Sequence, residues 1–432
     1  MKRSPIIFTA LFALLSLTLF CPGPALCSAA ESEGDAAAKA VNAFAIDLYG
    51  QLRDGSGNIF FSPYSISASL AMAYAGARGE TESQMAKALH FSLEKSKING
   101  AFRALNEQVL AAGGRKGLEL NIANALWAEK SFSFKKEFLE TVRINFLPDH
   151  GWFPRIPFVT EAVASIWPGD PGCLRQVDFR HAPESARKTI NSWVEKQTRN
   201  KIKDLMSPDS ISSGTRLVIT NAIYFKGFWE SQFKKKWTKQ DKFTLLDGTE
   251  IKVPMMEQTK PFGYAEKLEL QIVEMPYKGE GLSMVVLLPS KQKNFDEFER
   301  SLTSDKLHRW TRMLPMRLVE VHFPKFKMDS AYRLRRTLMK LAMTDPFSVN
   351  DADFSGMTGK KNLFIEEALH KAFVDVKEEG TEAAAATAVT ATLKGMPRPK
   401  PIPVFRADHP FVFLIWHKPS RCILFMGRVV KP

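Results

Sequence analysis

The chain has 432 residues, of which 45% are hydrophobic and 25% are charged, and its formal net charge at pH 7 is +14. This is the composition of an ordinary soluble globular protein, and no segment after residue 30 is apolar for long enough to cross a bilayer. The length suggests two or three domains, but no Pro/Gly/Ser-rich linker or charge run divides the chain. We therefore expect one large domain over residues 31–432.

The first thirty residues have the layout of a secretory signal peptide. Lys2 and Arg3 precede an apolar run from Ile6 to Phe20, and Ser28-Ala-Ala30 offers small residues for cleavage. The run is shorter than the roughly 18–20 residues that a membrane anchor needs. We expect cleavage near residue 30 and a mature protein without a membrane attachment, either extracellular or, in a bacterium, in the envelope or periplasm.

Removal of residues 1–30 takes away two basic residues and no acidic ones, so the net charge falls to +12. Basic clusters occur at 234–236 and 333–336, but neither is interleaved with aromatic residues in a repeating way. This argues against a nucleic-acid partner. Glycosaminoglycan binding stays open as an alternative to a lysine-rich solvated surface.

Residue periodicity predicts helices early in the chain. The predicted elements of this half are a helix over 35–53, a helix capped by Ser65 or Ser67 and closed by Gly76 and Gly79, a helix opened by a capping box of Thr81 and Gln84, a half-buried strand over 119–128 and an amphipathic helix over 184–199.

The C-terminal half is rich in strands, which we predict at 216–225, 281–289, 317–326, 411–416 and 422–430. Helices early and strands late, without regular alternation, indicate an α+β fold with large, mostly antiparallel sheets. Residues 146–173 fit neither half. They are rich in Pro, Gly and aromatic residues and lack periodicity, which predicts a long irregular insertion.

Catalytic signatures are missing from the sequence. It contains no Gly-x-Ser-x-Gly, His-Glu-x-x-His, phosphate loop or Gly-x-Gly-x-x-Gly motif, and its eight histidines form no short-spaced metal set. We therefore expect no enzyme, no cofactor and no metal site.

Residues 377–393 carry the most informative pattern. Their alanines would favour a helix, but Gly380 and the threonines weaken it, and the stretch has no apolar stripe to bury. As a strand, every second residue from Thr381 to Leu393 is small or apolar and shares one face. Such a strand can enter a sheet without burying a charge on that face. The prolines from Pro397 onward prevent it from extending much further.

The stretch Glu378-Glu-Gly-Thr-Glu-Ala-Ala-Ala-Ala-Thr387 resembles the hinge of an inhibitory serpin. Six further motifs resemble those of serpins, in the family's order: Asn58-Ile-Phe-Phe-Ser-Pro-Tyr-Ser65, Thr220-Asn-Ala-Ile-Tyr-Phe-Lys-Gly-Phe-Trp229, Phe323-Pro-Lys325, Leu369-His-Lys-Ala-Phe373, Ala407-Asp-His-Pro-Phe411 and Phe425-Met-Gly-Arg428. They span nearly the whole mature chain. The resemblance implies about nine helices around three mostly antiparallel β-sheets, with an exposed reactive-centre loop at 378–400.

The family also implies a mechanism and a set of site residues. A protease attacks the loop and forms an acyl-enzyme, and the cut loop then inserts into the central sheet of a metastable fold. The resemblance assigns the hinge to Glu378, Gly380, Thr381, Ala383, Ala384, Ala385, Ala386 and Thr387. It assigns a shutter-like cluster under the sheet to Ser62, Ser65, Asn221 and His370. It assigns a breach-like cluster, where the loop first enters, to Trp229, Lys325 and Glu378.

Serpins mostly place the bait bond fourteen residues after the hinge glycine, which implies Lys394–Gly395. The other basic residues nearby, Arg398 and Lys400, precede prolines, which trypsin-like proteases cleave poorly. The stretch from Gly380 to Pro410 is a few residues longer than usual, so Leu393 and Met396 remain alternatives.

The expected function is that of a secreted, monomeric suicide-substrate inhibitor whose partner is a trypsin-like serine protease. The alternative is a non-inhibitory serpin that acts as a carrier or chaperone. The hinge of such a protein typically holds proline or bulky charges, and the alanines at 383–386 argue against it.

Overall fold

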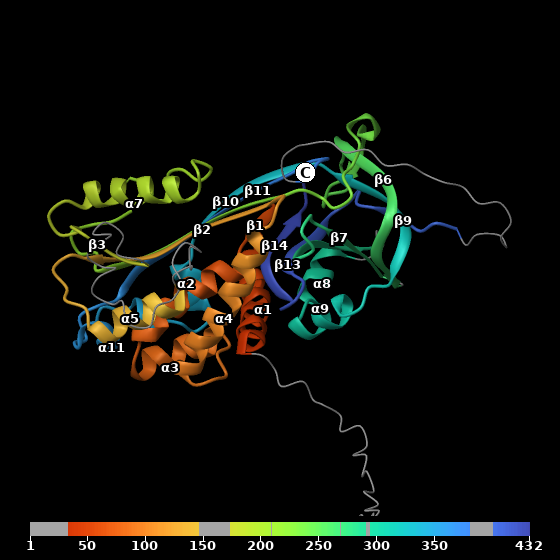
Figure 1. Ribbon diagram of the computed structural model, residues 1–432. Coiled ribbons are helices and arrows are strands. Elements are labelled where there is room, and N and C mark those ends of the chain that lie inside the picture. The colour runs from red at the N-terminus through yellow and green to blue at the C-terminus, as the bar shows by residue number, and fades with distance from the viewer. Residues whose placement is uncertain (1–32, 147–172, 209, 268, 291–293, 381–400) are drawn as a thin grey trace, which may run out of the picture. The chain divides into compact units, whose positions relative to one another are not determined.

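The structure is a computed structural model that describes residues 33–146 and 173–432, apart from 209, 268, 291–293 and 381–400. Residues Glu33–Pro432 form one compact unit (Figure 1). Among the described helices, none is both long and apolar enough to cross a membrane. The predicted signal peptide and nearly all of the predicted insertion at 146–173 lie outside the described residues.

Ten α-helices and two 3-10 helices form within the described ranges. They are α1 Glu33–Leu52, α2 Pro63–Gly76, α3 Gly79–Ala88, α4 Lys95–Gly113, α5 Lys136–Phe146, α7 Pro183–Gln197, η1 Lys235–Trp237, α8 Phe295–Arg300, α9 Ser304–Thr311, α10 Arg335–Lys340, η2 Asp345–Phe347 and α11 Ser355–Thr358. Helices α1 and α7 confirm the predicted helices at 35–53 and 184–199 to within two residues.

Two predicted helix starts are wrong. Helix α2 is capped by Ser62, whose hydroxyl accepts the N–H of Ser65, and Pro63 fills the first helical position, where its missing N–H costs nothing. Helix α3 already begins at Gly79, so Thr81 lies inside it. The Thr81 hydroxyl instead accepts the N–H of Asp353 from a distant loop, a partner that local spacing does not reveal.

Fourteen strands form two sheets in the described part of the chain. The strands are β1 Ile59–Phe61, β2 Leu118–Glu129, β3 Leu174–Val177, β4 Leu217–Gly227, β5 Lys239–Thr244, β6 Glu250–Lys267, β7 Leu270–Pro276, β8 Leu282–Pro289, β9 Met316–Pro324, β10 Phe326–Arg333, β11 Ile365–Val376, β12 Val404–Arg406, β13 Phe411–His417 and β14 Cys422–Val429. The α+β class and the predicted strands are confirmed.

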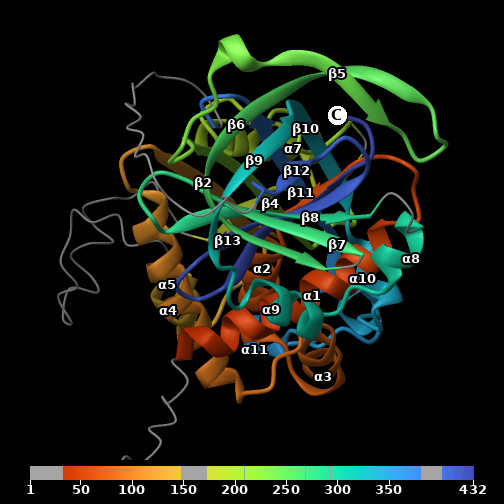
Figure 2. The same ribbon diagram turned by 90° about the vertical axis from the view of Figure 1, so that its right-hand side faces the viewer.

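The family resemblance implied three sheets, whereas the described strands form only two. The reason is β6, which is 18 residues long. Its first part pairs with β5 and β9 (Figure 2), and its last residues, from Gly263, pair with β7. One continuous strand therefore joins two groups of strands into a nine-stranded sheet.

The five-stranded sheet has the order β10-β11-β4-β2-β3. Its two central strands, β11 and β4, are parallel neighbours, whereas β11 pairs with β10 and β4 with β2 in the antiparallel sense. Helix α7 covers one face of the sheet, and α2 and other N-terminal helices lie on the other (Figure 1). Because β4 is buried along nearly its whole length, the centre of this sheet is a dry environment.

Candidate functional site

A row of polar residues crosses the middle of the five-stranded sheet. Asn124 on β2 is directly opposite Asn221 on β4, which is opposite His370 on β11, which is opposite Tyr332 on β10. Residues opposite each other in a sheet point to the same face, so the four side chains form one line beneath it. Asn221 and His370 are almost completely buried.

The shutter-like cluster is built on this row by the start of α2. His370 Nε2 accepts the N–H of Ser62 at 3.0 Å, and its Nδ1–H donates to the Asn221 side-chain oxygen. The Asn221 amide donates to the hydroxyls of Ser65 at 2.5 Å and Ser69 at 3.0 Å. The structure thus brings together all four residues that the sequence proposed for this cluster.

Three members of the cluster were missed by the sequence reading: Ser69, Asn124 and Tyr332. Asn124 accepts the Ser65 hydroxyl at 2.9 Å, and the ring of Tyr332 stacks on His370 with an interplanar angle of 10°. Asn124 had a detectable signal, since it is a polar residue inside a strand that was correctly predicted. The other two depend on which elements pack together.

We expect His370 to make the folded state sensitive to acid. Burial disfavours the imidazolium and lowers the pKa of His370 to about 3, from an ordinary value of 6.5. Below pH 6.5 the unfolded chain therefore takes up a proton that the folded chain does not, and stability falls as the pH falls. Between pH 7 and pH 5 this residue alone should lower the free energy of unfolding by about 2 kcal/mol.

Urea unfolding at pH 7 and pH 5 measures this effect. His370→Gln should lose only part of the acid sensitivity, because burial and nearby Arg115 also lower the pKa of His417, to about 4. His181→Gln is the control, since 71% of that side chain is exposed. An unchanged pH dependence in His370→Gln would contradict the prediction.

The turn that follows β11 is tied to the segment that follows β4. Lys377 and Gly380 exchange two backbone hydrogen bonds, at 2.8 and 3.1 Å, which makes a two-residue hairpin turn. The indole N–H of Trp229 donates to the Lys377 carbonyl at 3.0 Å, and the Trp229 backbone N–H donates to the Glu379 carbonyl at 3.0 Å. The ring of Trp229 stacks on Tyr277 at 4.5 Å between centroids, which holds it in place.

An ion pair completes the breach-like cluster. Lys325 Nζ donates to one carboxylate oxygen of Glu378 at 3.1 Å and lies 2.9 Å from the other, and Thr238 donates to the same carboxylate at 2.9 Å. Burial alone would raise the pKa of Glu378, but the hydrogen bonds from Lys325 and Thr238 outweigh it and hold the pKa below its ordinary value. The three residues proposed from the sequence therefore meet here, while Thr238 was missed.

Gly380 is the last described residue before the loop, and it lies between the ends of the two central strands. It is bridged to Lys377 on one side and to Phe228 on the other, both in the antiparallel sense. Its φ is +119°, and a Cβ at this position would overlap the carbonyl oxygen of Gly227. Only glycine fits here.

Gly380→Ala should lower the free energy of unfolding by about 3 kcal/mol, through backbone strain and the overlap with Gly227. Gly248→Ala is a matched control, since Gly248 has a φ of +83° but open space around it. It should cost about 1 kcal/mol. Equal losses in urea unfolding of the two variants would show that the close approach to Gly227 does not matter.

The remaining hinge residues, Thr381 to Thr387, and the predicted bait residues Lys394 and Gly395 lie outside the described residues. Their roles stay predictions. The described residues form the parallel strands β11 and β4, the turn at 377–380 at one end of them and the shutter-like cluster across their middle. This arrangement can control whether another strand enters between β11 and β4, and that function requires no catalytic residue.

Comparison with known proteins agrees with this architecture. The sequence model of the family described as serpin (serine protease inhibitor) matches residues 39–150 and 172–432, so the unmatched residues 151–171 fall within the predicted insertion. A leukocyte elastase inhibitor of Bos taurus is 43% identical over 399 residues, which cover 90% of this chain and 97% of that protein. A serpin-like protein of Thermococcus kodakarensis is 40% identical, over 91% of this chain and 85% of its own length.

Solved structures are similar as well. The structure of uncleaved ovalbumin superimposes with a TM-score of 0.76 at 29% identity and covers 92% of this chain and 100% of its own. The native state of the thermophilic serpin tengpin superimposes with a TM-score of 0.77 at 27% identity, over 91% of this chain and 94% of its own. The chain belongs to the serpin family, and it is a protease inhibitor rather than an enzyme.

Proposed function

We propose that this serpin is exported and that it traps trypsin-like serine proteases by offering the bond between Lys394 and Gly395. The observation that carries the proposal is the turn at 377–380. Gly380 already has one antiparallel neighbour on each side, Lys377 and Phe228. Since β11 and β4 are parallel, a strand that continues from Gly380 is antiparallel to both and can pair with both.

The pairing of Gly380 sets the register of such a strand. In the antiparallel register set by the bridges of Gly380 to Lys377 and Phe228, Ala385 of the inserted strand would lie opposite Ala372 on β11 and Ile223 on β4. Both of these residues are fully buried in the hydrophobic core. In the same register, Thr387 would lie opposite His370, so its hydroxyl would join the row of polar side chains that crosses the sheet. The face from Thr381 to Leu393 that the sequence marks as small or apolar is thus the face that points into the core.

The length of β11 matches the insertable segment. Its twelve residues pair with a twelve-residue strand, which in this register ends at Thr392, two residues before Lys394. Insertion would carry a group attached at Lys394 along the whole strand, a distance of about 40 Å. A protease bound there is therefore moved from one end of the sheet to the other.

The chemistry up to insertion is that of an ordinary protease. The serine hydroxyl oxygen bonds to the Lys394 carbonyl carbon, the peptide bond to Gly395 breaks, and the leaving amine takes up a proton. The protease is then joined to Lys394 through an ester. Insertion before water reaches the ester leaves the complex trapped, whereas slow insertion releases a cleaved loop.

A second candidate is an inhibitor of elastase-type proteases. It is favoured by the 43% identity to a protein named leukocyte elastase inhibitor. Elastases have a small specificity pocket, which does not suit a lysine. The bait bond would then follow Leu393, because the bond after Met396 leads into Pro397 and serine proteases cleave poorly before proline.

Incubation with trypsin and, separately, with leukocyte elastase tests both candidates on a denaturing gel. A complex with trypsin and a released fragment that begins at Gly395 support the first candidate, and Lys394→Ala should abolish this complex while Arg398→Ala retains it. A complex with elastase alone, with a fragment that begins at Lys394, supports the second. Clean cleavage by both proteases without a complex would overturn both candidates.

Export is supported by the layout of residues 1–30, in which Lys2 and Arg3 precede an apolar run and small residues follow. Mass spectrometry of protein secreted by an expressing cell tests it. The expected N-terminus lies near Glu31. Protein that stays inside the cell with residues 1–30 intact would contradict export.

A further inference from the structure

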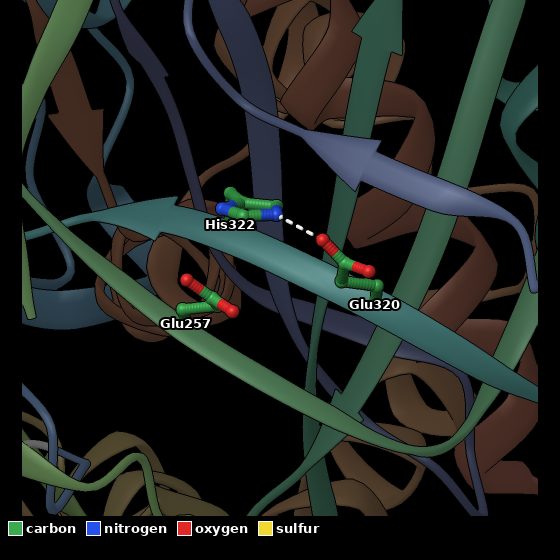
Figure 3. A group of neighbouring side chains, drawn as sticks. All are labelled: Glu257, Glu320 and His322. Carbon is green, nitrogen blue, oxygen red and sulfur yellow. Dashed lines mark hydrogen bonds and ion pairs between the residues drawn. The ribbon is translucent and has the colours of Figure 1, made fainter. Parts of the chain in front are cut away.

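Three potential metal ligands lie together on one face of the nine-stranded sheet, and none of them belongs to the clusters described above. Glu320 and His322 are two residues apart on β9, and Glu257 on β6 is directly opposite His322. Figure 3 shows the His322 imidazole turned toward the Glu320 carboxylate, with Glu257 on the neighbouring strand. The register of β6 and β9 creates this group, since it places Glu257 opposite His322, 65 residues later in the sequence.

We propose that Glu257, Glu320 and His322 form a binding site for a divalent transition-metal ion, and that the ion is Zn2+. One ligand atom from each residue lies within 4.8 Å of the others, and His322 Nε2 is 2.7 Å from Glu320 Oε1. Zinc binds imidazole nitrogen and carboxylate oxygen at about 2.0–2.2 Å, so its ligand atoms are about 3.3 Å apart. Small side-chain rotations therefore suffice to place all three atoms around one ion.

The surroundings suit an ion that enters from solvent. The His322 side chain is only 8% exposed, so the ring is held in place, whereas the Glu320 side chain is 37% exposed. Leu318 and Val404, on the same face, are 48% and 43% exposed, and they leave the site open. One imidazole with two carboxylates is a ligand set for Zn2+ rather than for Ca2+ or Mg2+, and the fourth position is left to water.

Arg406 places a positive charge beside the same nitrogen of His322. It lies on β12, directly opposite His322, and its Nη2 is 3.1 Å from His322 Nε2 while Nη1 donates to Asp241 at 2.6 Å. The 2.7 Å contact with the Glu320 carboxylate places a hydrogen on His322 Nε2, so an ion at this nitrogen must displace that hydrogen and also lies beside the guanidinium charge. Zinc binding therefore requires the Arg406 guanidinium to move away from His322 while it keeps its contact with Asp241.

Titration of the chelator-treated full chain with ZnCl2, followed by calorimetry at neutral pH, tests the site. We expect one ion per chain. His322→Gln and Glu257→Gln should weaken binding at least tenfold, because each removes one of three ligands. Arg406→Gln should tighten it several-fold, because it removes the positive charge beside the ion. Co2+ should give the visible absorption of a four-coordinate site, and His322→Gln should abolish that spectrum.

His181→Gln is the matched control, because His181 is an exposed histidine 3.2 Å from a single carboxylate, that of Asp178. It should bind zinc as the unchanged protein does. The proposal fails if zinc binding is not saturable, if Glu257→Gln with a native circular dichroism spectrum binds as tightly as the unchanged protein, or if His181→Gln abolishes binding. Should His322→Gln not fold, Glu257→Gln and Glu320→Gln keep the test decisive.

Discussion

Ala385→Glu should turn this inhibitor into a substrate of its target protease. In the register set by Gly380, residue 385 enters the sheet level with Ala372 and Ile223, both fully buried. A carboxylate there meets no partner, and burying it costs several kcal/mol. Since each 1.4 kcal/mol slows a step tenfold, insertion should fall behind hydrolysis of the acyl-enzyme. The number of inhibitor molecules consumed per trapped protease should rise at least tenfold.

Glutamate at the neighbouring position 384 is the matched control. In the same register it is level with Phe373 and Tyr224 on the other face, whose rings lie beneath Lys327 at 5.2 Å and Lys201 at 5.6 Å. A carboxylate beside two lysines has opposite charges as neighbours. Ala384→Glu should therefore raise the number of inhibitor molecules consumed per trapped protease far less than Ala385→Glu does. Titration of protease activity and denaturing gels measure both variants. Equal effects would mean that the register, or the insertion itself, is wrong.

Loss of the carboxylate at Glu299 should cause the largest fall in stability. Glu299 on α8 binds Arg428 on β14 through both carboxylate oxygens, at 2.9 and 3.0 Å, and each side chain is only 3% exposed. Tyr49 on α1 donates to the same carboxylate. Glu299→Gln leaves a buried guanidinium without its counter-charge, which should lower the free energy of unfolding by about 3–5 kcal/mol.

The adjacent residue provides a control on the same helix. Arg300 pairs with Asp296 at 2.8 Å, but these side chains are 66% and 57% exposed. Arg300→Ala should therefore cost less than about 1 kcal/mol. Replacing both Glu299 and Arg428 by methionine should recover part of the loss, since no charge is then stranded. A loss below 1 kcal/mol in urea unfolding of Glu299→Gln would show that the pair does not contribute as its burial suggests.

The motif that contains Arg428 was visible in the sequence, but its partner was not. Glu299 lies on a six-residue helix with no distinctive spacing, and it reaches Arg428 only because α8 packs near the end of β14. The breach-like cluster shows the same limit, since Thr238 joins Lys325 and Glu378 from a segment that carries no serpin motif. Partners that come from distant segments have no signal in local periodicity.

The sequence alone determined the class of fold and the approximate positions of four helices and six strands, and it predicted which face of residues 381–393 can be buried, because these follow from patterns within a single segment. Through ordered motifs that resemble those of serpins, it also identified four residues of the shutter-like cluster and three of the breach-like cluster, but it missed Ser69, Asn124, Tyr332 and Thr238. Only the tertiary structure decided that β6 merges the remaining strands into one sheet, and that Gly380 already lies between β11 and β4. It alone placed Glu257 opposite His322. Strand register and packing bring together residues far apart in the chain, and no spacing within one segment encodes them.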